Sequence, residues 1–159
     1  MARPNDEAIG RLGSFSSVVT VEHPTGIGVA YADLDGINPG LVTATKIPNF
    51  LRQVTGQNDG NTAVLLSISI IDKAKQGAAM NILFFNGPVD LTSADNAALN
   101  IPDADLAAKY IGRVAVAATD YINVSAASTG CVKNIGLVCK AAGQDLYAVL
   151  QSAGTPTYT

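Results

Sequence analysis

The sequence predicts an all-β domain, built as an antiparallel β-sandwich or barrel. Short runs rich in β-branched and aromatic residues recur at a spacing of roughly 8–15 residues, which is typical of such folds. Turn residues such as Gly, Pro, Asn and Asp separate these runs. No helical pattern of about 10–15 residues lies between them, as a β-α-β fold would need. A chain of 159 residues fits one domain and can bury a core without metal or disulfide bonds.

The first third of the chain begins with an extended arm over residues 1–13, because two Gly, one Pro and several charged side chains disfavour a packed element there. Four strands are expected after it, and each ends at a turn signal. The last of them precedes a polar loop over residues 56–61. The four expected strands cover residues 15–22, 27–31, 41–47 and 50–55.

Residues 62–72 (TAVLLSISIID) give the strongest strand pattern in the sequence. Its alternation predicts Leu66, Ile68 and Ile70 on one face. A second apolar strand is expected over residues 80–85 (MNILFF). The charged connection between the two strands indicates a long hairpin.

The composition changes to small and acidic residues before the last strands. Pro102, Asp103 and Asp105 precede Ala, Leu and Lys109, which is the chemistry of a helix start, so a short helix is expected over residues 102–109. Further strands are expected over residues 110–118, 132–139 and 146–151. The sandwich domain therefore covers residues 14–152, and residues 153–159 form an extended polar tail.

Charge is sparse, and this favours a surface covered by neighbouring molecules. Only 14% of residues are charged, against a usual share of about 25%, while 48% are hydrophobic. No apolar stretch approaches the roughly 20 residues that a membrane helix needs, and the polar first residues do not resemble a signal peptide. The net charge of −3 and the scattered Lys and Arg residues argue against nucleic-acid binding. An assembly remains the favoured setting.

The two cysteines are interpreted as buried small apolar side chains in a reducing compartment. Cys131 and Cys139 are eight residues apart within a strand-rich region. This spacing matches neither a CxxC redox pair nor a metal site.

The residues that could support catalysis are few. His23 is the only histidine and precedes a proline in a turn-like context. Asp33 with Asp35, and Asp103 with Asp105, are the close carboxylate pairs, but the first lacks the other ligands of a calcium loop and the second suits a helix N-terminus. No phosphate-binding glycine motif is present. We therefore expect no catalytic residues, no cofactor and no bound metal, and a protein that is not an enzyme.

Four stretches together resemble the capsid decoration, or cement, proteins of tailed phages. They cover roughly the C-terminal three-fifths of the chain and carry the resemblance by their order and spacing. They are SISIIDKAKQGAAM over residues 67–80, ILFFNGP over residues 82–88, TSADNAAL over residues 92–99 with IPDADL over residues 101–106 and IGRV over residues 111–114, and LYAVLQSAGTPTYT over residues 146–159.

The resemblance implies a jelly-roll-like antiparallel β-sandwich that sits at junctions between subunits of the major capsid protein. It also implies a homodimer or homotrimer and no catalytic residues. The expected function is a virion structural protein that binds the outer surface of the capsid shell and stabilises it. Assembly would take place in the host cytoplasm, without nucleic-acid or membrane partners.

Both termini supply candidate contacts to such a partner. The arm offers two cations and two apolar anchors, and the tail offers a proline and an aromatic residue with a polar tip. Two other functions remain open: a glycan-binding or receptor-binding head-fibre module, and a head-completion or tail structural protein. The predicted interface residues are Arg3, Ile9, Arg11, Leu12, Pro156 and Tyr158.

Overall fold

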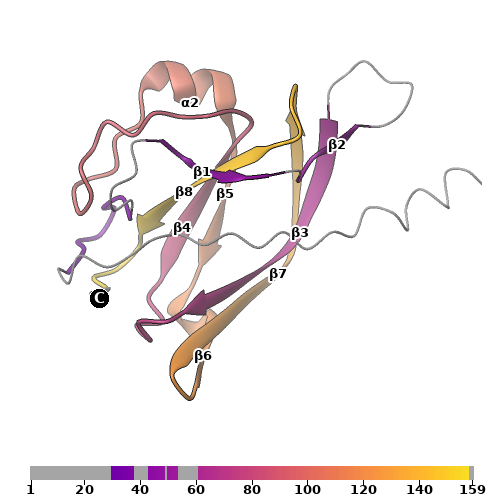
Figure 1. Ribbon diagram of the computed structural model, residues 1–159. Coiled ribbons are helices and arrows are strands. Elements are labelled where there is room, and N and C mark those ends of the chain that lie inside the picture. The colour runs from indigo at the N-terminus through magenta and orange to yellow at the C-terminus, as the bar shows by residue number, and fades with distance from the viewer. Residues whose placement is uncertain (1–29, 38–42, 49, 54–60, 158–159) are drawn as a thin grey trace, which may run out of the picture.

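The computed structural model describes residues 30–37, 43–48, 50–53 and 61–157, which form two four-stranded antiparallel sheets (Figure 1). The first sheet has the strand order β1-β8-β4-β5, and the second has the order β2-β3-β7-β6. The strands are β1 (Thr45–Ile47), β2 (Arg52–Gln53), β3 (Asn61–Asp72), β4 (Met80–Phe85), β5 (Tyr110–Val116), β6 (Tyr121–Val124), β7 (Ala127–Ala141) and β8 (Leu146–Ser152). A short helix α2 (Asp103–Lys109) and a 3-10 turn η1 (Ala118–Asp120) complete the elements.

This architecture confirms the all-β class predicted from the turn-punctuated strand pattern. The helix expected over residues 102–109 is also present as α2. The jelly-roll connectivity stays a prediction, because the order of the described strands does not establish it. The arm over residues 1–13 and the strand expected over residues 15–22 lie outside the described residues.

The core lies between the two sheets. Phe84, Val116 and Leu146 contribute from the first sheet, and Leu65 and Cys139 contribute from the second. Burying a large aliphatic or aromatic side chain of this kind stabilises the fold by about 1.5–3 kcal/mol.

The two sheets approach each other closely at Gly112 of β5. A Cβ atom on Gly112 would lie only 2.7 Å from Cδ1 of Leu137 on β7. A real Cβ atom does not come so close to a carbon atom, so a larger residue here would displace the leucine side chain. The missing side chain at Gly112 therefore leaves room for Leu137 and lets the two sheets pack closely.

A second apolar cluster covers the other face of the first sheet. Phe85 and Val149 project from that face and pack against Val89, Leu91 and Ile101 of the connection between β4 and β5. Phe84 and Phe85 thus point to opposite sides of β4, and both are buried, as a covering layer predicts. The first sheet is therefore enclosed on both faces.

The hairpin expected between residues 62–72 and 80–85 is wrong, because β3 and β4 belong to different sheets. The connection turns away at Asp72, whose carboxylate accepts hydrogen bonds from the backbone N–H groups of Ala74 (3.0 Å) and Gly77 (2.7 Å). Gly77 has a φ of +53°, which favours glycine. This compact turn directs the chain into the other sheet. β3 pairs instead with β2, which precedes it, and with β7, which lies more than fifty residues further along the chain.

The expected face of Leu66 is also wrong, because a bulge interrupts the ladder between β3 and β7. The register shifts between Leu65, which pairs with Leu137, and Ser67, which pairs with Lys133. Between these two pairs β3 contributes only Leu66, whereas β7 contributes three residues, 134–136. Such an irregularity changes which face the following side chains occupy. Leu65 is consequently buried, whereas Leu66 is 67% exposed. Beyond the bulge, Ile68 and Ile70 return to the core side.

Candidate interaction surface

The face of the second sheet that points away from the core carries an unusual number of exposed apolar side chains. We call this surface the outer face. Leu66, Ile71, Ile122 and Val138 are each at least 66% exposed, and Val64 and Val124 are about half exposed. The six residues come from three adjacent strands, namely β3 (Val64, Leu66 and Ile71), β6 (Ile122 and Val124) and β7 (Val138).

The apolar residues form two groups, one toward each end of the sheet. Val64 and Val138 are cross-strand partners, and Leu66 follows on β3. At the other end, Ile71 and Ile122 both pair with Thr129, which lies between them on the central strand. Val64 and Ile71 are seven positions apart on β3, a distance of about 23 Å at the usual rise of a strand. The polar residues Ser67, Ser69 and Lys133 lie between the two groups. Clusters of exposed apolar side chains rimmed by polar residues are typical of interaction sites in soluble proteins.

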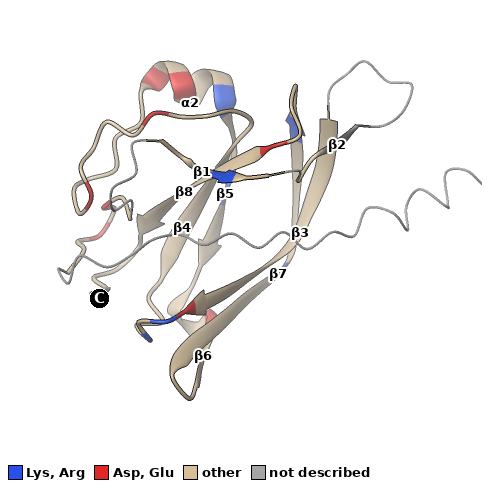
Figure 2. Ribbon diagram, viewed as in Figure 1, with Lys and Arg blue, Asp and Glu red and all other residues tan. Residues whose placement is uncertain are grey.

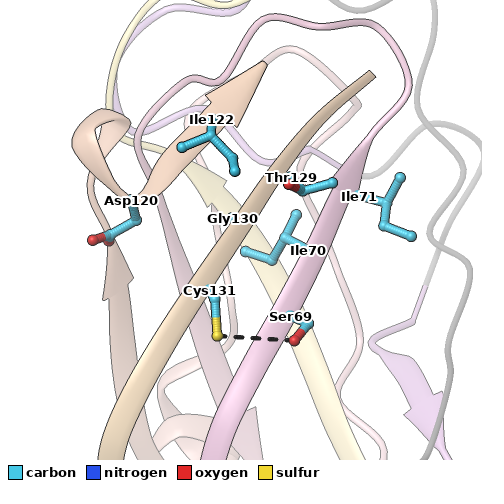
Figure 3. A pocket seen from close by; sticks show the side chains of 8 residues that line it. All are labelled: Ser69, Ile70, Ile71, Asp120, Ile122, Thr129, Gly130 and Cys131. Atoms are coloured by element: carbon cyan, nitrogen blue, oxygen red, sulfur yellow. Dashed lines mark hydrogen bonds between the residues drawn. The ribbon is translucent and has the colours of Figure 1, made fainter. Parts of the chain in front are cut away.

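A shallow depression lies beside the second apolar group (Figure 3). Cys131 and Ser69 face each other across its floor, and the Ser69 hydroxyl donates to Sγ of Cys131 at 3.9 Å. Asp120 and Ile122 stand at its margin. Small side chains here would let a partner approach the sheet backbone.

Cys131 corrects the expectation that both cysteines are buried. Cys131 is exposed on the outer face, whereas Cys139 is completely buried in the core. In a regular strand, residues eight apart point to the same side. The irregular stretch of β7 between Lys133 and Leu137 breaks this rule, with positive φ values at Asn134 (57°) and Gly136 (66°). Burial raises the pKa of the Cys139 thiol to about 11.

The charges on the outer face are positive. Lys133 and Lys140 are exposed: Lys133 follows the partly buried Val132, and Lys140 lies between the buried residues Cys139 and Ala141. In Figure 2, β3 and β7 are mostly free of charged residues, whereas acidic residues gather on α2 and in the segments beside it. On the described strands β3, β6 and β7, no outward-facing position carries a carboxylate.

The tail residue Pro156 is buried in the body of the domain instead of projecting as an anchor. Its carbonyl oxygen accepts a hydrogen bond from the backbone N–H of Tyr31 at 2.8 Å, and Thr157 pairs with Ala30. Backbone pairing with the segment around Tyr31 holds this part of the tail. The other predicted contacts, Arg3, Ile9, Arg11, Leu12 and Tyr158, lie outside the described residues, as does His23.

The first carboxylate pair serves local structure. Asp35 is buried, and its Oδ2 accepts a hydrogen bond from the backbone N–H of Ala32 at 2.7 Å, which stabilises a turn. Asp33 is exposed beside it.

The second carboxylate pair lies in the first turn of α2. Asp105 forms an ion pair with Lys109 at 2.7 Å, and this contact lowers the pKa of the Asp105 carboxyl. Asp103 precedes it in the same turn, where a negative charge is favourable. Within the part of the chain that the structure describes, no three His, Cys, Asp or Glu side chains gather to hold a metal ion. The described helices also include none long and apolar enough to cross a membrane.

Sequence reasoning missed the outer face. Ile122 and Val124 belong to a four-residue strand that was not predicted, and Leu66 was expected on the same face as Ile68 and Ile70. One signal was available in the sequence: three of the four residues from Tyr121 to Val124 are aromatic or β-branched, which favours a strand.

Comparisons with known proteins identify no relative of the chain. No protein-family model matches it, and searches of curated proteins and of solved structures return no significant match. The outer face and its lysines are therefore the features on which a functional proposal can be built.

Proposed function

We propose that the chain is a non-enzymatic structural protein of a tailed-phage virion. It decorates the outside of the capsid by binding the major capsid protein, and this binding stabilises the shell. The observation that carries the proposal is the exposed apolar outer face of the second sheet, formed by six large side chains on β3, β6 and β7. The resemblance of four sequence segments to phage decoration proteins supports the same function.

The outer face has the properties of a docking surface. The largest apolar patch on a monomeric protein typically covers about 300–600 Å², and it is often functional. Here three of the exposed apolar side chains lie along the twelve-residue strand β3, one lies on the neighbouring strand β7, and two lie on β6. Covering them with a partner would release water from side chains such as Leu66 and Ile71, which is favourable in proportion to the area buried.

The sandwich holds this surface rigidly before any partner binds. Exposed residues of the outer face alternate with core residues on β3 and β7, as Leu66 does with Leu65 and Val138 with Cys139. Because the strands are fixed by the β3–β7 ladder, binding costs little further ordering of the backbone.

Decoration would stabilise a shell by mass action. A protein that binds only the assembled state adds its binding free energy to the stability of that state. Symmetry repeats the contact around the shell, so many modest contacts add up when one molecule bridges subunits. The arm residues Arg3, Ile9, Arg11 and Leu12 remain candidates for additional contacts.

The test measures binding to capsid shells that lack the protein. The purified chain is added to such shells, and its occupancy is measured after sedimentation. Leu66→Asp and Val138→Asp should each reduce the affinity at least tenfold, because each buries a charge in an apolar contact. The matched control is Leu106→Asp, which changes an exposed leucine on α2 and should bind like the wild type.

Circular dichroism and thermal unfolding of each variant establish that the fold is intact. Failure of the wild-type chain to bind shells at all would reject the proposed function. Saturable binding that Leu66→Asp and Val138→Asp leave unchanged would move the docking surface away from the outer face.

A further inference from the structure

We propose that the outer face binds an apolar protein surface that presents carboxylate groups, and that this partner is the capsid shell, not a second copy of the chain. The inference rests on the proposed function and names the chemistry of the partner. It is drawn from the positions of the two lysines on the outer face and from where the acidic residues of the chain lie.

Lys133 lies in the middle of the outer face. It pairs with Ser67 on β3, between the group of Val64 and Val138 and the group of Ile71. Any partner that covers both apolar groups also covers this lysine. A buried ammonium group is costly unless an opposite charge and hydrogen bonds compensate it. The partner surface therefore has to supply an acceptor, and a carboxylate is the natural one.

Lys140 extends the positive character to one end of the same face. It pairs with Thr62 and lies two residues beyond Val138 on β7. Two other lysines of the chain already have acidic partners, since Lys46 contacts Asp145 and Lys109 contacts Asp105, each at 2.7 Å. Within the described residues, neither lysine of the outer face forms an ion pair, so both charges are available to a partner.

A second copy of the chain does not complement this surface. If two outer faces packed together, each would bring lysines and no carboxylate from the outward positions of β3, β6 and β7. Asp120 stands at the margin of the depression, and its Oδ2 already accepts a hydrogen bond from the backbone N–H of Ala117 at 2.8 Å. The acidic residues of α2 and its neighbouring segments lie away from β3 and β7 (Figure 2). Like charges placed together in an interface oppose association.

The test reverses the charge of each lysine and measures shell binding at several salt concentrations. Lys133→Glu should weaken binding at least tenfold, and Lys140→Glu, nearer the rim, should weaken it less. Both variants should show a smaller loss of affinity with added NaCl than the wild type, because attraction between the protein and the shell is screened by salt. Arg113→Glu is the matched control, since this exposed residue of β5 lies in the other sheet, opposite Leu83.

The same samples are examined by analytical ultracentrifugation without shells. The expected result is that Leu66→Asp leaves the molecular mass of the free protein unchanged, because no second copy occupies the outer face. A wild-type dimer that Leu66→Asp dissociates would overturn the inference and assign the face to self-association.

Shell binding that needs Leu66 and Val138 but is unaffected by Lys133→Glu and Lys140→Glu would also overturn the inference. In that case the decoration function would stand. Absence of wild-type binding would instead reject the proposed function, and the inference with it.

Discussion

Lys133 and Leu66 show how the position of one residue decides its role. Both flank the irregular part of the β3–β7 ladder, where the register slips between Leu65 and Ser67. A slip of this kind moves side chains from the core side to the solvent side. Leu66 becomes part of the outer face, and the same irregularity places Cys131 and Cys139 on opposite sides of β7. Reading these residues correctly from the sequence would have required knowing where the bulge lies.

Cys139 gives a prediction for the pH dependence of stability. Burial raises the pKa of its thiol from 9.0 to about 11, so the folded state favours the neutral form. The stability that this provides is fully present below pH 9 and is lost as the pH rises through 11. In urea unfolding at pH 8 to 11, Cys139→Ala should lose less free energy of unfolding across this range than the wild type, by an amount on the order of 2 kcal/mol.

Cys131→Ala serves as the control in that experiment, because it removes a thiol from the exposed face. It should follow the wild-type pH dependence. A Cys139→Ala variant whose free energy of unfolding falls as steeply as that of the wild type would contradict the assignment. The rise of the Tyr121 pKa to about 12 acts in the same direction and is common to all three proteins.

At the scale of elements, local pattern predicted several segments well. The strands expected over residues 62–72, 80–85 and 146–151 correspond to β3, β4 and β8, and the charged helix start correctly predicted α2. Pairing between strands was not predictable in the same way. The partner of β3 lies on β7, far along the chain, and the alternation of a strand does not encode which edge it joins. The short β6 was missed because its exposed apolar residues suit an interface more than a core.

The bulge in the β3–β7 ladder yields a paired prediction from two neighbouring leucines of β3. Leu65 is 8% exposed and Leu66 is 67% exposed. Leu65→Ala should lower the free energy of unfolding by about 2–5 kcal/mol, because it leaves a cavity between the sheets. Leu66→Ala should change it by less than about 0.5 kcal/mol, as exposed substitutions usually do. Chemical denaturation of both variants checks this. A larger loss for Leu66→Ala than for Leu65→Ala would mean that β3 has the regular alternation expected from the sequence, and equal losses would contradict the burial of Leu65.

At the scale of the whole molecule, the two sheets differ in how far their faces are covered. The first sheet is covered on one side by the second sheet and on the other by the connection that includes Val89 and Leu91. The second sheet keeps its outer face exposed, with Leu66, Ile71 and Ile122 among its side chains. Composition predicted a covered surface, since charge is sparse. Composition does not indicate which surface a neighbour would cover, because the exposed face depends on how strands distant in sequence form the two sheets.

The central claim is that this chain decorates a phage shell through its outer face. Cryo-electron microscopy of shells saturated with the purified protein tests the claim most directly. The account predicts β-rich density repeated at junctions between capsid subunits, with β3, β6 and β7 toward the shell and a shell carboxylate beside Lys133. Density confined to one vertex or to the tail, or a bound protein whose outer face points into solvent, would contradict it.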